Sequence, residues 1–223
     1  MFDGKFRQSV DAKTAPVGTA LVRLGFSADV LTASGLLFAF ATAWLIGTGH
    51  HHGAIVLLIV TGAHDLFDGP VAKASHSSSV RGAFFDSVMD RLSDGALLGG
   101  IAYFLVAQHR GELVLLPFAI MTTTFMISYE RAKAESLGLK AKGGLMERAE
   151  RMIVLGVALI APVLFVPVLW LLLGLTTATA VGRFVRVWVV AGRPPERELP
   201  APRVRRHRHT SERRRAFSRS FRP

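Results

Sequence analysis

Long apolar segments separated by short charged ones constrain the fold of this chain more than any other feature. We expect helices at about 30–48, 53–74, 82–108, 112–138, 148–166 and 168–191. Each is near the ~20 residues that an α-helix needs to cross a bilayer. Half of the 223 residues are hydrophobic, and a soluble core would not need so many. The sequence therefore predicts an all-α integral membrane protein with six transmembrane helices.

The chain before the first apolar segment has a different character. Residues 1–27 are amphipathic and of mixed charge, and they lack the apolar core and cleavage site of a signal peptide. We expect an N-terminal amphipathic juxtamembrane helix that lies along the membrane surface. Residues 28–192 would then form the six-helix membrane domain.

The positions of Lys and Arg predict the orientation of the helices. Basic residues occur before the first predicted helix and in the loops after the second and the fourth, whereas the remaining loops contain only Arg110. By the positive-inside rule, both termini and these basic loops lie on the cytoplasmic side. We therefore expect a multi-pass protein of the cell (plasma) membrane with cytoplasmic termini.

Residues 193–223 form a separate, Arg-rich segment. They include eleven Arg and three Glu, so they carry +8 of the formal net charge of +11. Several prolines argue against a regular helix, and the composition predicts a disordered cytoplasmic tail attracted to anionic lipid headgroups. A membrane-anchored nucleic-acid-binding protein is the alternative. We do not expect nucleic acid as a partner, because no folded reader or aromatic platform accompanies the tail.

Four aspartates lie at the facing ends of the second and third predicted helices: Asp65, Asp68, Asp86 and Asp90. Spacings of three and four residues put each pair on one helix face, and the two pairs converge if the helices are antiparallel. Four close carboxylates would repel one another unless cations neutralised them, and oxygen ligands favour Mg²⁺, Mn²⁺ or Ca²⁺ over zinc. The sequence therefore predicts a site for one or two divalent ions at the cytoplasmic side.

The aspartates belong to a longer pattern, Asp-x2-Asp-Gly-x2-Ala-Lys-x8-Gly-x3-Asp-x3-Asp, which begins at Asp65. This pattern resembles the signature of the CDP-alcohol phosphotransferases, which are integral membrane enzymes of phospholipid synthesis. Lys73 stands where the family usually has Arg, and Pro70 is expected to kink the helix within the motif. The resemblance implies that Asp65, Asp68 and Asp86 hold Mg²⁺ or Mn²⁺. It also implies that Asp90 is the general base and contacts the metal.

The same resemblance implies a site for CDP-diacylglycerol. Its residues would be Asp29, Thr32, Asp68, Gly69, Ala72, Lys73 and Gly82. Gly69 and Gly82 lack a Cβ, so a phosphate-bearing ligand or a second helix could approach the backbone there. Taken without the resemblance, the segment from Asp29 to Thr32 is typical of a helix cap.

A second group of charged residues follows at the cytoplasmic ends of the later helices. The candidates are Arg131, Lys133, Arg148, Arg151 and Arg183. If they face inward they form a pocket for an anion, and if they face outward they extend to the lipid headgroups. Spacing alone leaves both interpretations open.

The sequences around these cations, Ser-Tyr-x-Arg-Ala-Lys-Ala-Glu and Gly-Gly-x2-Glu-Arg-x-Glu-Arg, begin at Ser128 and Gly143. They resemble the actinobacterial phosphatidylinositol phosphate synthases, with Arg and Lys exchanged at positions 131 and 133 and Ala149 in place of a common Pro. The resemblance implies that Arg131, Arg151 and Arg183 bind the acceptor phosphate, with Lys133 and Arg148 in support.

The expected activity follows from both resemblances. A phosphatidyl group would pass from CDP-diacylglycerol to inositol phosphate, giving phosphatidylinositol phosphate and CMP, in an enzyme that is typically a homodimer. The same chemistry with glycerol 3-phosphate as acceptor is an alternative. A cation transporter that uses the buried aspartates is an alternative of another class. It predicts ion flux without release of CMP.

Overall fold

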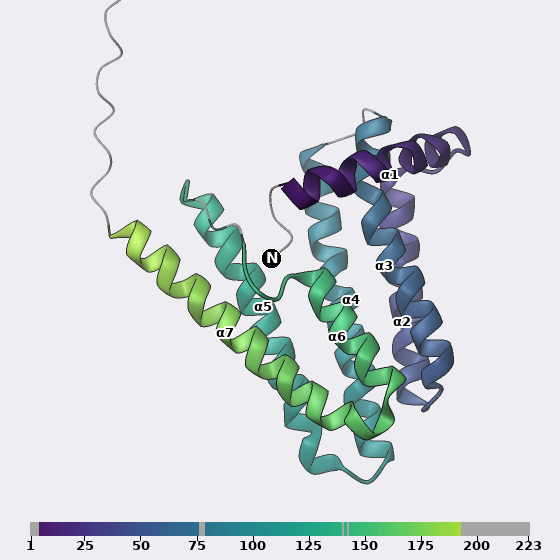
Figure 1. Ribbon diagram of the computed structural model, residues 1–223, viewed down its shortest axis with the longest axis vertical. Coiled ribbons are helices and arrows are strands. Elements are labelled where there is room, and N and C mark those ends of the chain that lie inside the picture. Colours follow the sequence, from purple (N-terminus) through teal and green to yellow (C-terminus); the bar gives the residue numbers. More distant parts are fainter. Residues whose placement is uncertain (1–4, 76–78, 140, 142, 193–223) are drawn as a thin grey trace, which may run out of the picture. The chain divides into compact units, whose positions relative to one another are not determined.

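The structure is a computed structural model that describes residues 5–75, 79–139, 141 and 143–192. Every regular element in these residues is a helix (Figure 1). The helices are α1 (Lys5–Arg23), α2 (Ala28–Gly47), α3 (His51–Ala74), α4 (Val80–Ala107), α5 (Leu115–Ser136), α6 (Arg148–Ile160) and α7 (Phe165–Ala191), with 3₁₀ turns at Gly111–Val114 and Pro162–Leu164. By its contacts the chain divides into Met1–Ala191, which holds all of these helices, and Gly192–Pro223. The predicted tail, residues 193–223, lies outside the described residues.

The helices pack as a bundle in which α2 contacts both α3 and α4. Helix α5 packs against α7 and α4, and α6 packs against α7 and α3. Helix α1 contacts α3, and in Figure 1 it runs crosswise to the other helices at one end of the bundle. The aspartate motif lies towards this end, because it occupies the last turns of α3 and the first turns of α4.

Glycines bring two pairs of helix backbones into close contact. A Cβ on Gly100 of α4 would lie 2.4 Å from the carbonyl oxygen of Ala43 on α2. A Cβ on Gly18 of α1 would lie 2.8 Å from the carbonyl carbon of Pro70 on α3. Neither position can hold a larger residue unless the helices move apart. Through the contact of Gly18 with Pro70, α1 packs directly against the aspartate motif.

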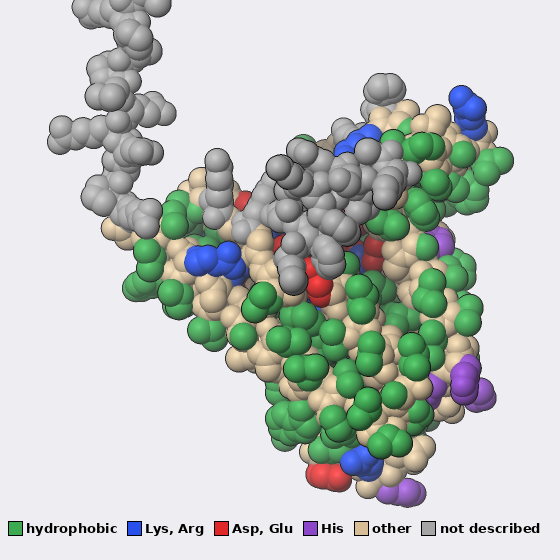
Figure 2. Space-filling view, in the orientation of Figure 1, with side chains coloured by type: hydrophobic (Ala, Val, Ile, Leu, Met, Phe, Trp, Pro, Cys, Tyr) green, Lys and Arg blue, Asp and Glu red, His purple; other side chains and the backbone are tan. Residues whose placement is uncertain are grey.

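The surface of the bundle is that of a membrane protein. Large hydrophobic side chains such as Trp44, Val163 and Trp188 are well exposed, which a bilayer tolerates and water does not. On the face drawn in Figure 2, hydrophobic side chains cover most of the helices, and charged ones lie mainly towards the two ends. Four segments of the described chain are long and apolar enough to cross a membrane: Ala28–Gly47, His51–Ala74, Gly111–Ser136 and Pro162–Ala191.

The other two expected spans differ from these four. Helix α4 is 28 residues long but carries several charges in its first half. The prediction of a continuous helix over 148–166 is wrong, because α6 ends at Ile160 and a 3₁₀ turn begins at Pro162. Proline has no N–H to continue the helix. The 13 residues of α6 span about 20 Å, less than the ~30 Å hydrocarbon core of a bilayer.

Candidate active site

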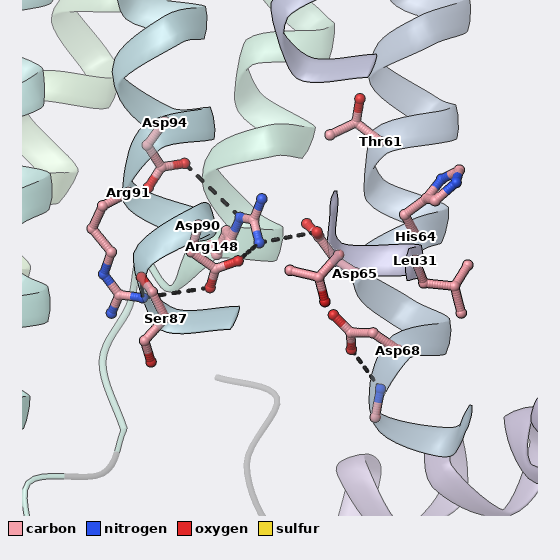
Figure 3. Close-up of polar contacts among 12 residues, drawn as sticks. Leu31, Thr61, His64, Asp65, Asp68, Ser87, Asp90, Arg91, Asp94 and Arg148 are labelled. Atoms are coloured by element: carbon pink, nitrogen blue, oxygen red, sulfur yellow. Dashed lines mark hydrogen bonds and ion pairs between the residues drawn. The ribbon is translucent and has the colours of Figure 1, made fainter. Parts of the chain in front are cut away.

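The carboxylates of the motif face one another across α3 and α4. Asp65 and Asp68 lie one turn apart on α3 and point towards Asp90 of α4 (Figure 3). Helix α3 continues through Pro70 to Ala74, so the local helix keeps these two acids on one face. Asp86 lies one turn before Asp90, close enough to Asp68 for the two carboxylates to repel each other. The structure thus brings the four predicted acids into one electrostatic cluster.

The guanidinium of Arg148, on the first turn of α6, lies between the two sets of acids (Figure 3). Its Nη1 is 3.0 Å from Asp65 Oδ1 and also donates to Asp90 Oδ1. Arg91 lies on the other side, with Nη1 3.5 Å from Asp90 Oδ2 and 2.6 Å from the carbonyl oxygen of Ser87. Both oxygens of Asp90 are therefore held by cations.

The oxygen atoms of the aspartate cluster are suitable ligands for a hard divalent cation. They are carboxylate oxygens, which Mg²⁺ and Mn²⁺ prefer. A Cβ on Gly69, next to Asp68, would meet no atom of the described residues within 4 Å, so there is open space beside the acids. No three acidic, His or Cys side chains of the described part are already spaced to hold a metal ion. Asp65 and Asp90 are instead paired with Arg148.

The beginnings of α2 and α4 meet beside this cluster. Asp29 Oδ1 lies 3.7 Å from the position that a Cβ on Gly82 would take. Ser27 is the N-cap of α2 and accepts a hydrogen bond from the N–H of Val30 at 3.3 Å. The interpretation of Asp29 as a cap is therefore wrong. Its exposed carboxylate stands in the first turn.

The other predicted nucleotide-site residues lie on α2, α3 and α4. Thr32, in the next turn of α2, donates its hydroxyl to the Ala28 carbonyl oxygen at 3.1 Å. Ala72 is half-buried and Lys73 exposed, both in the last turn of α3. The N–H of Gly82 donates to the N-cap Ser79 at 3.0 Å.

Two of the predicted acceptor-binding cations are buried and have protein partners. Arg151 is 9% exposed, and its Nη2 lies 2.7 Å from Asp94 Oδ2. Arg183 is 2% exposed. Its Nη1 donates to the carbonyl oxygen of Ile127 at 2.7 Å, and its Nη2 donates to that of Gly143 at 3.2 Å. Arg183 thereby ties α7 to α5 and to the connection before α6.

Arg131 and Lys133 lie in the last turns of α5, and the charge of Arg131 acts on that of Arg183. Arg131 Nε is 3.1 Å from Glu135 Oε1 on the same helix, and Lys133 is exposed. Of the five predicted cations, Arg148 pairs with the aspartates and Arg151 with Asp94, whereas Arg183 binds backbone carbonyls. Asp94 was missed by sequence reasoning, although a single further acid four residues after Asp90 in an apolar stretch is itself a signal.

Comparison with known proteins places these observations in a family. The sequence profile of the CDP-alcohol phosphatidyltransferases matches residues 26–192. The match covers the helices that carry the acids and the buried arginines, and more than half of the chain. The protein therefore belongs to the CDP-alcohol phosphatidyltransferase family and is a membrane-bound transferase.

Individual relatives narrow the comparison. A phosphatidylinositol phosphate synthase of Corynebacterium glutamicum is 34% identical over 198 residues, which cover 85% of this chain and 88% of the relative. An archaetidylinositol phosphate synthase of Methanothermobacter thermautotrophicus is 34% identical over 171 residues, which cover 74% of this chain and 85% of the relative.

The fold is also that of a solved structure. The crystal structure of Mycobacterium tuberculosis phosphatidylinositol phosphate synthase with CDP-DAG bound has a TM-score of 0.72 and 30% identity, over 78% of this chain and 93% of that one. The same enzyme in complex with manganese and citrate also gives a TM-score of 0.72 and 30% identity, over 78% of this chain and 88% of that one.

Proposed function

We propose that this protein transfers a phosphatidyl group from CDP-diacylglycerol to inositol phosphate, giving phosphatidylinositol phosphate and CMP. The observation that carries the proposal is the cluster of Asp65, Asp68, Asp86 and Asp90 between α3 and α4, in a chain of this family. Two relatives are named for inositol phosphate products, and a similar structure holds CDP-DAG. These names favour inositol phosphate over glycerol 3-phosphate as the acceptor.

Asp65, Asp68 and Asp86 would hold Mg²⁺ or Mn²⁺. A bound divalent ion would neutralise the diphosphate of CDP-diacylglycerol and the charge that develops on departing CMP. Asp29, Thr32, Gly82 and the residues around Gly69 would hold the nucleotide end of the donor. The manganese in the related crystal structure supports this assignment of the cofactor.

Asp90 would accept the proton from the attacking hydroxyl of inositol phosphate. A new bond forms between that oxygen and the phosphorus that bears diacylglycerol, and the bond from this phosphorus to CMP breaks. The ion pairs of Asp90 with Arg148 and Arg91 fix the direction in which the carboxylate points, and the oxygen that takes the proton would have to exchange one of these contacts for the hydroxyl.

The buried arginines would hold the phosphate of the acceptor. The Nε atoms of Arg183 and Arg148 have no hydrogen-bond partner among the described residues, so each retains a donor for an anion. Arg151 lies on the same face of α6 as Arg148, one turn further along the helix. Arg131 and Lys133 would contact the acceptor at the cytoplasmic mouth of the site.

The membrane arrangement belongs to the same proposal. Helices α2 to α7 would provide six spans of the plasma membrane, with α6 covering part of its thickness and α1 lying on the cytoplasmic surface. Both termini would be cytoplasmic, the tail would contact anionic lipids, and the protein would work as a homodimer. Basic residues at the ends of α3 and α5 support this orientation.

The decisive test is release of CMP by the purified protein in detergent. CDP-diacylglycerol and Mn²⁺ would be supplied with inositol phosphate, free inositol or glycerol 3-phosphate. We expect release with inositol phosphate and none from Asp90→Asn, which should still bind CDP-diacylglycerol. Glu112→Gln is the matched control, because it makes the same change in an exposed acid on the Gly111–Val114 turn.

The other outcomes separate the alternatives. Release only with glycerol 3-phosphate would keep the mechanism and replace the acceptor. Cation flux in vesicles without CMP release would favour a transporter. Full activity of Asp90→Asn would exclude this residue as the base.

A further inference from the structure

Asp94 is a buried acid that lies outside the four-aspartate pattern. It is 9% exposed and stands one turn beyond Asp90 on α4. Its Oδ2 accepts a hydrogen bond from Arg151 Nη2 at 2.7 Å, and its Oδ1 lies 4.0 Å from Arg148 Nε. One carboxylate thus faces both arginines of α6.

A guanidinium as buried as that of Arg151 requires a counter-charge, since an unpaired charge is costly away from water. Among the described residues, Asp94 is the acid paired with Arg151. The Nη1 of Arg151 donates to the carbonyl oxygen of Met146 at 3.3 Å. Arg148, by contrast, reaches Asp65 and Asp90 with its Nη1. The two arginines therefore differ in their nearest acids: Arg148 pairs with Asp65 and Asp90, and Arg151 pairs with Asp94.

A small cavity beside this ion pair adds a second observation. It has a volume of about 30 Å³, and its polar lining comes from Asp94, Arg151 and Thr124 of α5. The Thr124 hydroxyl is buried and has no partner in the described part of the chain. The rest of the lining is apolar, and the cavity has room for the extra methylene of Glu in place of Asp94.

We propose that Asp94 is a positioning residue for the acceptor side of the site: it holds Arg151 in the orientation that binds the acceptor phosphate. The inference rests on the proposed function. Asp94 contacts neither the acceptor nor a metal ion; it acts through the arginine.

The test compares Asp94→Asn, which removes the charge at nearly constant shape, with Asp94→Glu, which keeps the charge and can extend into the cavity. We expect Asp94→Asn to raise the KM for inositol phosphate by about tenfold or more, as loss of a residue that orients a ligand does elsewhere. Asp94→Glu should have a KM for inositol phosphate close to that of the wild type. The KM for CDP-diacylglycerol and the affinity for Mn²⁺, measured by electron paramagnetic resonance, should stay within about twofold in both variants. Asp94 is hydrogen-bonded to Arg151, whereas Arg148 is 4.0 Å from it and keeps its closer contacts with Asp65 and Asp90. Thr124→Val, which lines the same cavity, is the control for a packing effect and should leave the acceptor KM unchanged.

Direct binding separates this inference from the proposed function. Calorimetry with inositol phosphate requires no turnover, and it should show weaker binding to Asp94→Asn than to the wild type or to Asp94→Glu. Equal binding to all three proteins overturns the role of Asp94, as does wild-type protein that does not bind inositol phosphate. Loss of Mn²⁺ affinity in Asp94→Asn would make Asp94 a metal ligand instead. Wild-type protein that binds inositol phosphate but releases no CMP would refute the proposed function alone.

Discussion

Replacing Gly100 by Ala should destabilise the protein, whereas the same change at the neighbouring Gly99 should not. A Cβ on Gly100 would lie 2.4 Å from the carbonyl oxygen of Ala43 and 2.9 Å from its carbonyl carbon and Cα. Carbon–oxygen contacts are normally about 3.4 Å, so α2 and α4 must separate by about 1 Å. All three atoms belong to the backbone, so a change of rotamer cannot relieve the contact. A Cβ on Gly99 would meet no described atom within 4 Å.

The size of the effect follows from two opposing terms. Overpacking costs about 1–3 kcal/mol, and a backbone clash belongs at the upper end. Ala in a helix regains about 1 kcal/mol relative to Gly. The net loss for Gly100→Ala is then about 2 kcal/mol, or a fall of roughly 4–8 °C in the melting temperature for a protein of this size.

The assay is thermal unfolding of both variants in one detergent, followed by circular dichroism. Gly99→Ala should melt at or slightly above the wild-type temperature. Equal melting temperatures for Gly99→Ala and Gly100→Ala would refute the close approach of α2 and α4.

Three further changes test other parts of the structure. Gly18→Ala would place a Cβ 2.8 Å from the carbonyl carbon of Pro70, so we expect a lower melting temperature and weaker packing of α1 on α3. Faster proteolysis of α1 would report the weaker packing, and unchanged cleavage would argue against the contact. Arg183→Gln removes a buried guanidinium that donates to two backbone carbonyls. We expect the free energy of unfolding to fall by about 3 kcal/mol in denaturant titrations. Wild-type stability of this variant would mean that these hydrogen bonds do not form. Asp29→Asn should raise the KM for CDP-diacylglycerol several-fold and leave that for inositol phosphate unchanged, and the opposite pattern would place Asp29 on the acceptor side.

Much of the aspartate site is predictable because it depends on local geometry. The spacings of Asp65, Asp68, Asp86 and Asp90 place each pair on one helix face in any α-helix. The apolar stretches on either side fix where the helices lie, to within a few residues. The facing of the two pairs then needs only an antiparallel arrangement.

The partners of the arginines could not be predicted in the same way, because they depend on contacts between distant segments. Arg183 binds the carbonyl oxygens of Ile127 and Gly143, and no pattern in the sequence marks a backbone acceptor. The early end of α6 does have a local cause in Pro162. Hydropathy alone did not predict this helix end, because the apolar stretch continues across the proline.

The position of both arginines on helix α6 would link the binding of the two substrates. Helix α6 carries Arg148 and Arg151 within its first four residues and is only 13 residues long, so any shift of this helix would carry both arginines with it. A ligand that displaces Arg148 from the acids by shifting α6 would therefore also move Arg151. Donor and acceptor binding would then be linked, and by reciprocity each ligand would change the affinity of the other by the same factor.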